Sequence, residues 1–248
     1  MKYQQIIKTI VFSFFVCLLQ LPCSAYFDVI AWGNLDPGDA DLSDVVEIAT
    51  NSYAVAALKA DGSVVTWGNS YYGGDSGTLD MTGVQSVYDG NSYFVALKTN
   101  GEVVTWGHAG NPASDSSGVR DELVNVQLLA LNNNAVAALR GDGTVVTWGS
   151  SSNGGDSSAV QDQLTNVQSI AGTGSAFAAL KANGTLVTWG HSGSGGNSGG
   201  VKDDLTNVVS LASTGGAFAA VKSNGSVVTW GDSDYGGDSS AAQEKLIN

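Results

Sequence analysis

The sequence predicts an all-β protein built from stacked copies of one small unit, and three observations support this. Six tryptophans, each followed by glycine, recur at intervals of 35, 39, 42, 41 and 41 residues. Five segments of 24 residues align without a gap, each ending in one of the last five Trp-Gly pairs. An Asp-Gly or Asn-Gly pair stands at the same place in each segment. A period of about 40 residues is typical of a supersecondary unit that was copied and stacked.

The five aligned segments, called repeats 1 to 5 below, are 45–68, 84–107, 126–149, 167–190 and 208–231. The connectors between them vary from 15 to 18 residues, as surface loops on a fixed module do. Residues 26–248 are therefore expected to form one repeat domain. Residues 27–33 align with the end of a repeat and form a partial unit.

Each repeat is expected to contain three short strands, which in repeat 4 are 167–171, 176–181 and 185–189. The Asp/Asn-Gly pair lies between the second and third strands. Such a pair favours a two-residue type I′ turn, in which both central residues have positive φ. The glycines expected to hold these turns are Gly62, Gly101, Gly143, Gly184 and Gly225.

A two-residue turn would fix which side chains share a face of the sheet. In repeat 1 it places Leu58 opposite Val65 and Ala56 opposite Trp67, on a bulky face. Ala57, which is alanine in every repeat, would lie on a smaller second face. Packing a bulky face on the small face of the next repeat produces a propeller or a solenoid. The tryptophans expected inside these interfaces are Trp67, Trp106, Trp148, Trp189 and Trp230.

The repeat also resembles a known family. The pattern A-[LV]-K-x-[DN]-G-x-[VL]-V-T-W-G, followed by a turn such as Tyr72-Gly73-Gly74-Asp75, resembles the regulator-of-chromosome-condensation repeat over residues 27–248. Members of that family form β-propellers, and this short repeat is similar to those of compact secreted bacterial members, which include a β-lactamase inhibitor. The resemblance implies a β-propeller of five three-stranded units, with an open or incomplete ring as one form. The family's usual histidine before the second strand is absent, so no partner-binding residue carries over.

Residues 1–25 have the pattern of a signal peptide. Lys2 and Lys8 precede the apolar run 10–19, and Cys23 and Ala25 supply small residues for cleavage before Tyr26. The run is shorter than the roughly 20 residues that a membrane-spanning helix needs. Both cysteines of the chain lie in this segment, so the mature chain would hold no disulfide. We therefore expect a secreted protein without a membrane span, which in a bacterium would be periplasmic or on the cell surface.

The charge of the chain restricts its partners. The formal net charge is −13, and it becomes −15 when the two lysines of the leader are removed. Nucleic-acid binding needs a basic surface that neutralises phosphates, so the composition argues against that function. An acidic surface is typical of a soluble protein outside the cell.

Two serine motifs resemble those of hydrolases but lack the context that catalysis needs. They are Gly-Asp-Ser-Gly at 74–77 and Gly-Asn-Ser-Gly-Gly at 196–200, both in connectors. A nucleophile elbow requires a strand before it and a helix after it, together with a histidine and an acid. The two histidines, His108 and His191, follow Trp-Gly in different repeats and are read as exposed loop residues. We expect no enzymatic activity.

Acidic connector residues make calcium the one cofactor to consider. Asp232, Asp234 and Asp238 place oxygen ligands near Gly236 and Gly237, as calcium loops do. The alternative is that such aspartates bind the backbone of tight turns. A basic residue also recurs beside each hairpin turn and is read as solvated at the sheet end. The members of this column are Lys59, Lys98, Arg140, Lys181 and Lys222.

These observations favour a secreted, non-catalytic module that binds a protein or a surface ligand through loops that vary on a constant scaffold. One alternative is a structural subunit of an extracellular layer or filament that self-associates through open ends. A second alternative is a calcium-dependent surface protein.

Overall fold

A computed structural model describes residues 35–241 of the chain. The predicted signal peptide, the partial unit 27–33 and the last seven residues lie outside the described residues. The described chain divides into two compact parts. The N-terminal part comprises residues 35–100 and 104–109, and the C-terminal part comprises residues 101–103 and 110–241.

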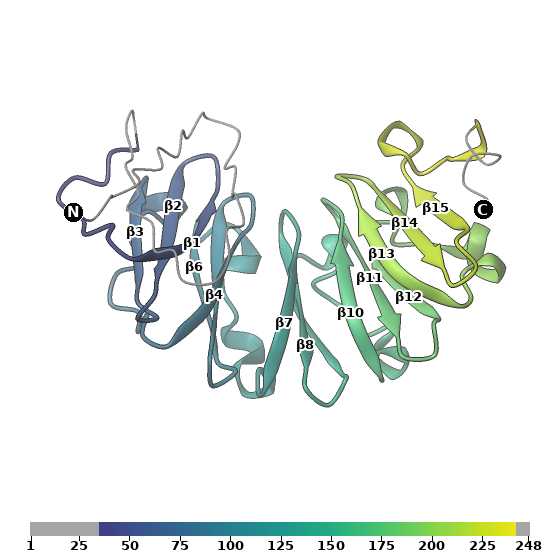
Figure 1. Ribbon diagram of the computed structural model, residues 1–248, viewed down its shortest axis with the longest axis horizontal. Coiled ribbons are helices and arrows are strands. Elements are labelled where there is room, and N and C mark those ends of the chain that lie inside the picture. The colour runs from purple at the N-terminus through teal and green to yellow at the C-terminus, as the bar shows by residue number, and fades with distance from the viewer. Residues whose placement is uncertain (1–34, 242–248) are drawn as a thin grey trace, which may run out of the picture. The chain divides into compact units, whose positions relative to one another are not determined.

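Residues 35–241 form five three-stranded antiparallel sheets, one for each repeat (Figure 1). The first strands are β1 (Val45–Thr50), β4 (Val84–Asp89), β7 (Val126–Leu131), β10 (Val167–Gly172) and β13 (Val208–Ser213). The second strands are β2 (Ala54–Lys59), β5 (Tyr93–Lys98), β8 (Ala135–Arg140), β11 (Ala176–Lys181) and β14 (Ala217–Lys222). The third strands are β3 (Val64–Gly68), β6 (Val103–Gly107), β9 (Val145–Gly149), β12 (Leu186–Gly190) and β15 (Val227–Gly231). The predicted strands are confirmed, with shifts of one residue at some ends.

The helices of the described chain are short 3-10 turns in the connectors. They are η1 (Ser70–Tyr72), η2 (Pro112–Ser114), η3 (Ser117–Glu122), η4 (Ser151–Asn153), η5 (Gln161–Gln163), η6 (Ser192–Ser194), η7 (Gly199–Asp204) and η8 (Ser233–Tyr235). The regular structure of each repeat is therefore β, and the connectors carry the irregular backbone.

The predicted two-residue type I′ turn is wrong. In repeat 1 the Lys59 N–H donates to the Ser63 carbonyl at 2.8 Å, and the Gly62 N–H donates to the Lys59 carbonyl at 2.9 Å. Gly62 has a φ of +82°, whereas Asp61 is not among the residues with positive φ. The loop is therefore a three-residue type I turn closed by a left-handed glycine. The Asp61 carboxylate accepts from the Ser63 N–H and hydroxyl, which holds Asp61 in this turn.

The longer turn moves the register by one residue. Leu58 pairs with Val64 rather than Val65, and Trp67 pairs with Val55 rather than Ala56. A one-residue shift exchanges the faces of one strand relative to the other. The alanine column that includes Ala57 consequently lies on the tryptophan face and not on the opposite one. The hydroxyl residue that follows the Asp/Asn-Gly pair in four repeats is the sequence signal for the longer turn.

Within each of the two parts, consecutive sheets stack with the tryptophan face of one repeat against the opposite face of the repeat before it. In the N-terminal part, Phe94 and Trp106 of repeat 2 bury against Ala56 of repeat 1. In the C-terminal part, Trp189 packs with Leu139, and Trp230 packs with Leu180. The prediction that repeats stack face to face is confirmed, but the predicted faces and direction are wrong, because the tryptophan face also carries the alanine column and packs on the preceding repeat. The order of the sheets can be followed in Figure 1.

The hairpin turns also join successive repeats. The carbonyl of the turn glycine accepts the N–H of the first valine of the next repeat, at 2.9 Å from Val84 to Gly62 and from Val167 to Gly143. A Cβ at Gly143 would also lie 3.2 Å from the Asn166 Cα. Glycine is therefore needed at these turns both for its positive φ and for the close approach of the next repeat.

Candidate functional site

Four connectors begin with the same short turn, and it is built from glycines. The helices η1, η4, η6 and η8 end at Gly73, Gly154, Gly195 and Gly236, which have φ between +90° and +98°. The second glycine of each Gly-Gly pair has a different role. A Cβ at Gly74 would lie 2.5 Å from the Gly68 carbonyl carbon. The Gly-Gly pair therefore folds the connector back onto the Trp-Gly end of its own repeat.

Each described tryptophan fixes the connector that precedes its repeat. Its indole N–H donates to a connector carbonyl 32 to 35 residues upstream, at 2.9–3.0 Å. The acceptors for Trp67, Trp106, Trp148, Trp189 and Trp230 are the carbonyls of Leu35, Gly73, Ala113, Gly154 and Gly195. These side chains are only 4–6% exposed. Trp106, Trp189 and Trp230 thus lie in interfaces between repeats. All five tryptophans also hold loops, a role the repeat spacing did not predict.

A second side chain holds the same turns from the loop between the first and second strands. It donates to the carbonyl of the last helical residue, at 2.7–3.0 Å. The donor and acceptor pairs are Asn51 and Tyr72, Asn132 and Asn153, Thr173 and Ser194, and Thr214 and Tyr235. The C-terminal end of each turn is therefore held by groups outside the turn and not by the side chains that the turn displays.

The side chains displayed by these turns differ between repeats. The four segments are Ser70–Tyr72, Ser151–Asn153, Ser192–Ser194 and Ser233–Tyr235. Their middle residues are Tyr71, Ser152, Gly193 and Asp234, and all four are exposed. A constant backbone therefore presents an aromatic, a hydroxyl, a bare backbone and a carboxylate at equivalent places.

The turn in the N-terminal part belongs to an exposed aromatic group, here called the tyrosine cluster, which consists of Tyr53, Tyr71, Tyr72 and His108. The Tyr53 and Tyr72 rings stack with centroids 4.2 Å apart, and Tyr71 meets His108 edge to face at 4.3 Å. Tyr53 is 48% exposed and Tyr71 is 59% exposed. Sequence reasoning missed this cluster, although Tyr71-Tyr72 is the only pair of adjacent aromatics in these four turns.

Comparison with solved structures gives the fold. The chain is similar to human WBSCR16 (18% identity, TM-score 0.53) over 75% of this chain and 61% of that one. It is similar to Prp20p from Saccharomyces cerevisiae (18% identity, TM-score 0.53) over 75% of this chain and 57% of that one. It also matches the CRINKLY WD40 ectodomain of the Arabidopsis thaliana receptor kinase ACR4 (18% identity, TM-score 0.50) over 75% and 63%.

The fold is that of RCC1-type β-propellers. A further structure in this group is yeast RCC1 (Prp20) bound to Kap60, at 20% identity and a TM-score of 0.52. The predicted resemblance is thereby confirmed at the level of the fold. The chain covers less than two thirds of the length of each of these structures. No protein-family model matches the sequence, and no curated protein matches it.

Two of the aspartates predicted to bind calcium accept hydrogen bonds from backbone N–H groups in this propeller chain. The Asp232 carboxylate accepts the Asp234 N–H and caps η8, and the Asp238 carboxylate accepts the Ser240 N–H, both at 2.9 Å. Asp75 and Asp156 make the same contact two residues ahead. Residues 35–241 contain no group of three or more metal-ligating side chains. Calcium binding at Asp232, Asp234 and Asp238 stays a prediction from the sequence alone.

The serine motifs and histidines are not brought together. Ser198 Oγ accepts from Thr188 Oγ1 at 3.1 Å, and the Ser76 N–H donates to Thr66 Oγ1 at 3.1 Å. His191 lies beside Ser194, and His108 belongs to the tyrosine cluster. Both serines therefore join a connector to a third strand.

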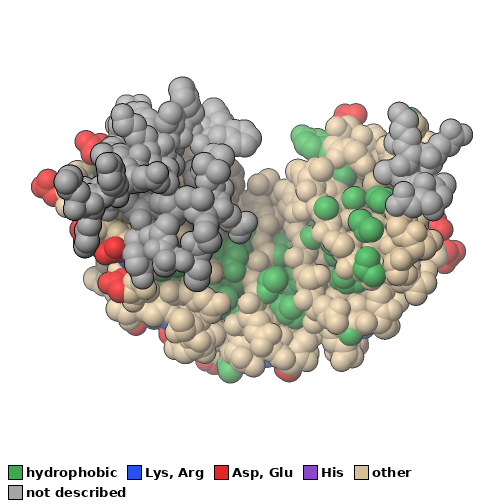
Figure 2. Space-filling view, viewed as in Figure 1, with side chains coloured by type: hydrophobic (Ala, Val, Ile, Leu, Met, Phe, Trp, Pro, Cys, Tyr) green, Lys and Arg blue, Asp and Glu red, His purple; other side chains and the backbone are tan. Residues whose placement is uncertain are grey.

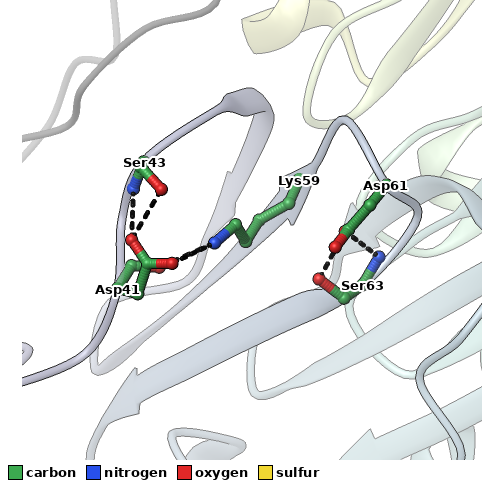
Figure 3. Close-up of polar contacts among 5 residues, drawn as sticks. All are labelled: Asp41, Ser43, Lys59, Asp61 and Ser63. Atoms are coloured by element: carbon green, nitrogen blue, oxygen red, sulfur yellow. Dashed lines mark hydrogen bonds and ion pairs between the residues drawn. The ribbon is translucent and has the colours of Figure 1, made fainter.

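Four members of the basic column bind connectors instead of being solvated as predicted. Lys59 Nζ lies 2.6 Å from Asp41 Oδ2 (Figure 3), and Lys98 Nζ lies 2.9 Å from Asp80 Oδ2. The corresponding acceptors for Arg140 and Lys181 are the carbonyls of Glu122 and Gln163. In all four cases the partner residue lies 18 positions before the basic residue in the sequence. Lys59 and Ser43 hold the pKa of Asp41 well below its usual range, and Thr82 and Lys98 do so for Asp80.

Two other carboxylates of the N-terminal part have raised pKa values. Burial raises the pKa of Glu47 on β1. Surrounding protein atoms also raise the pKa of Asp89 at the end of β4, although the residue as a whole is exposed.

Within residues 35–241, no helix is long and apolar enough to cross a membrane.

Proposed function

We propose that this chain is a secreted, non-catalytic protein-binding module whose partner contacts the connector turns. One observation carries the proposal: the turns have an anchored backbone and an exposed middle residue that changes from repeat to repeat. A binding site needs side chains that can vary without altering the scaffold, and loops on a rigid framework supply them.

The comparisons and the composition support the same class. Kap60 is bound to yeast RCC1 (Prp20), and the matched part of ACR4 is an ectodomain. The leader-like segment 1–25 supports secretion, and the net charge of −13 disfavours a nucleic acid as the partner.

Site-specific photo-cross-linking tests this proposal. A photoreactive residue is placed at Tyr71 or Asp234 in the connector turns, and at Ala60 or Ala182 in the hairpin turns, which are equally exposed. The proposal expects the same partner protein to be captured from the connector positions and not from the hairpin positions. Capture only from Ala60 and Ala182 would assign binding to the opposite set of turns and refute the proposal.

A second candidate function, assembly into a layer or filament, is favoured by the last sheet. In repeat 4 the face opposite Trp189 carries Leu180, which is 5% exposed. The equivalent Val221 of repeat 5 is 36% exposed, and Figure 2 shows hydrophobic side chains over β13 to β15. Another sheet docked there would repeat an interface that the chain already contains. Light scattering over a range of concentrations tests this, because assembly should be lost in Val221→Glu.

A further inference from the structure

The backbone of the turn Ser70–Tyr72 does not require its tyrosines. The turns Ser70–Tyr72 and Ser151–Asn153 have the same cap geometry, and in both the last carbonyl is bound by an asparagine. The second turn carries Ser152 and Asn153 where the first carries two tyrosines. Small polar residues therefore form the same turn, and the two tyrosines are not needed for its geometry.

The rings are held in place before any ligand arrives. Tyr72 is partly buried against the core between repeats 1 and 2, and Tyr53 stacks on it. Tyr71 and His108 complete the cluster from the other side of Tyr72, with centroids 5.3 Å and 5.7 Å from its ring. Rigid, exposed aromatic groups are typical of the few residues that dominate a binding interface.

The net charge of the N-terminal part favours a cation over an anion as the ligand. The N-terminal part has nine acidic and two basic side chains in its described residues. Both lysines are engaged, Lys59 with Asp41 and Lys98 with Asp80. The Asp89 carboxylate accepts a hydrogen bond from the Thr50 backbone, next to the loop that carries Tyr53. A negative field together with exposed ring faces attracts a positive group and repels a phosphate or carboxylate.

We infer that the tyrosine cluster binds an arginine side chain on a basic segment of the partner protein. This inference rests on the proposed function and names the chemistry of the partner at one connector turn. Arginine fits better than lysine because its planar guanidinium stacks on aromatic faces and is more weakly hydrated than an ammonium group.

Nuclear magnetic resonance titration of the full chain tests this inference. The probes are three capped peptides of Gly and Ser with one central arginine, lysine or citrulline, and the readout is the shift of the tyrosine and histidine ring signals. The arginine peptide should bind about two- to fivefold more tightly than the citrulline peptide, as an exposed cation–π contact implies. The lysine peptide should fall between the two.

The chain offers a matched variant and a matched control. Tyr71→Ser combined with Tyr72→Asn copies the turn of repeat 3 and should weaken arginine-peptide binding about two- to fivefold. Tyr71→Ser alone should give a smaller loss in the same direction and serves if the double variant is unfolded. Tyr235→Ser removes an equally exposed tyrosine from the equivalent turn of the C-terminal part and should leave binding unchanged.

Several results would overturn the inference. They are equal binding of the arginine and citrulline peptides, no binding of any peptide, an equal loss in Tyr235→Ser, or tighter binding of a neutral oligosaccharide with the same sensitivity to Tyr71. Cross-linking of a partner at Asp234 without arginine binding at Tyr71 would leave the proposed function standing and refute this inference alone. Binding of the arginine peptide at the tyrosine cluster without any cross-linked protein would refute the proposed function and leave arginine binding by the cluster standing.

Discussion

Two connector turns of this protein share a backbone and differ in what they display. The turn 69–74 of the N-terminal part begins at Asn69 (φ −73°, ψ 115°), and the turn 150–155 of the C-terminal part begins at Ser150 (φ −65°, ψ 124°). Their closing glycines have φ of +98° and +90°. One turn supports a cluster of aromatic rings, and the other carries Ser152 and Asn153. Backbone geometry and side-chain chemistry are therefore specified by different residues.

The residues that specify the backbone lie mostly outside the turn itself. An indole N–H from the next repeat, an amide or hydroxyl from the preceding hairpin and two glycines are the same in kind at both places. The connector after Trp106 shows the limit of this rule. It presents Ala113 to Trp148 instead of a glycine, and repeat 3 has Val136 where repeats 2, 4 and 5 have phenylalanine. In repeat 3, the smaller Val136 thus accompanies the larger Ala113 in the connector that precedes the repeat.

The largest expected effect comes from removing the tryptophan that holds the turn 150–155. Trp189→Ala deletes a buried side chain and should destabilise the protein by about 3–5 kcal/mol. Trp189→Phe keeps most of the packing and loses the bond to the Gly154 carbonyl, so about 1–2 kcal/mol is expected. Denaturant unfolding followed by circular dichroism measures both. Equal losses in the two variants would show that the indole N–H does not hold the turn.

A smaller loss is expected from a methyl group at the second glycine of the turn. Gly155→Ala places a Cβ against the Gly149 backbone, which cannot move independently of its sheet. We expect a loss of about 1–3 kcal/mol in unfolding free energy, and the same for Gly74→Ala in the other turn. Gly200→Ala is the control, because a Cβ there meets nothing within 4 Å. A neutral result at both Gly74 and Gly155 would contradict the shared-backbone explanation.

The side-chain anchor should be exchangeable between repeats. Asn132→Ala removes the bond to the Asn153 carbonyl and leaves the Ala135 N–H without its acceptor, for an expected loss of about 1–2 kcal/mol. Asn132→Thr should recover most of this, because Thr173 makes the equivalent pair of bonds in repeat 4. Thermal unfolding of the two variants distinguishes them. If threonine proved as damaging as alanine, the anchors of the two repeats would not be equivalent.

The smallest expected effect concerns the response of the N-terminal part to acid. Asp41 and Asp80 have pKa values lowered below those of the unfolded chain by their partners Lys59, Lys98, Ser43 and Thr82. Their stabilisation is therefore present above the unfolded pKa of about 4 and is lost as the pH falls through the lower folded pKa. The carbonyl acceptors of Arg140 and Lys181 do not titrate.

Asp41→Asn with Asp80→Asn should thus flatten the fall in melting temperature between about pH 5 and pH 2. Glu122→Gln is the control, since Arg140 contacts its carbonyl rather than its carboxylate. A slope that is unchanged by the Asp41 and Asp80 substitutions, or equally changed by the control, would show that these ion pairs do not set the acid response of the N-terminal part.

Much of the fold could be predicted from residues that act locally. The Asp/Asn-Gly pairs and the alternating apolar residues gave the number of strands and their antiparallel order, because a tight turn leaves two flanking strands one way to pair. The sequence failed at the turn length. Asp61-Gly62 is compatible with a two- or a three-residue loop, and the choice depends on the φ of Asp61, which the Ser63 contacts decide. One residue of error there exchanged the faces assigned to Ala56 and Ala57.

The candidate site shows the same division. The repeat spacing by itself determined the five sheets and the positions of the tryptophans in them, since a periodic sequence repeats its local physics in every copy. The tertiary structure alone decided that Tyr53 and His108, 55 residues apart in the chain, meet around Tyr72. It also decided that each tryptophan holds a carbonyl of the preceding connector. Such contacts depend on how one repeat lies on the next, and no pattern within a single repeat encodes that placement.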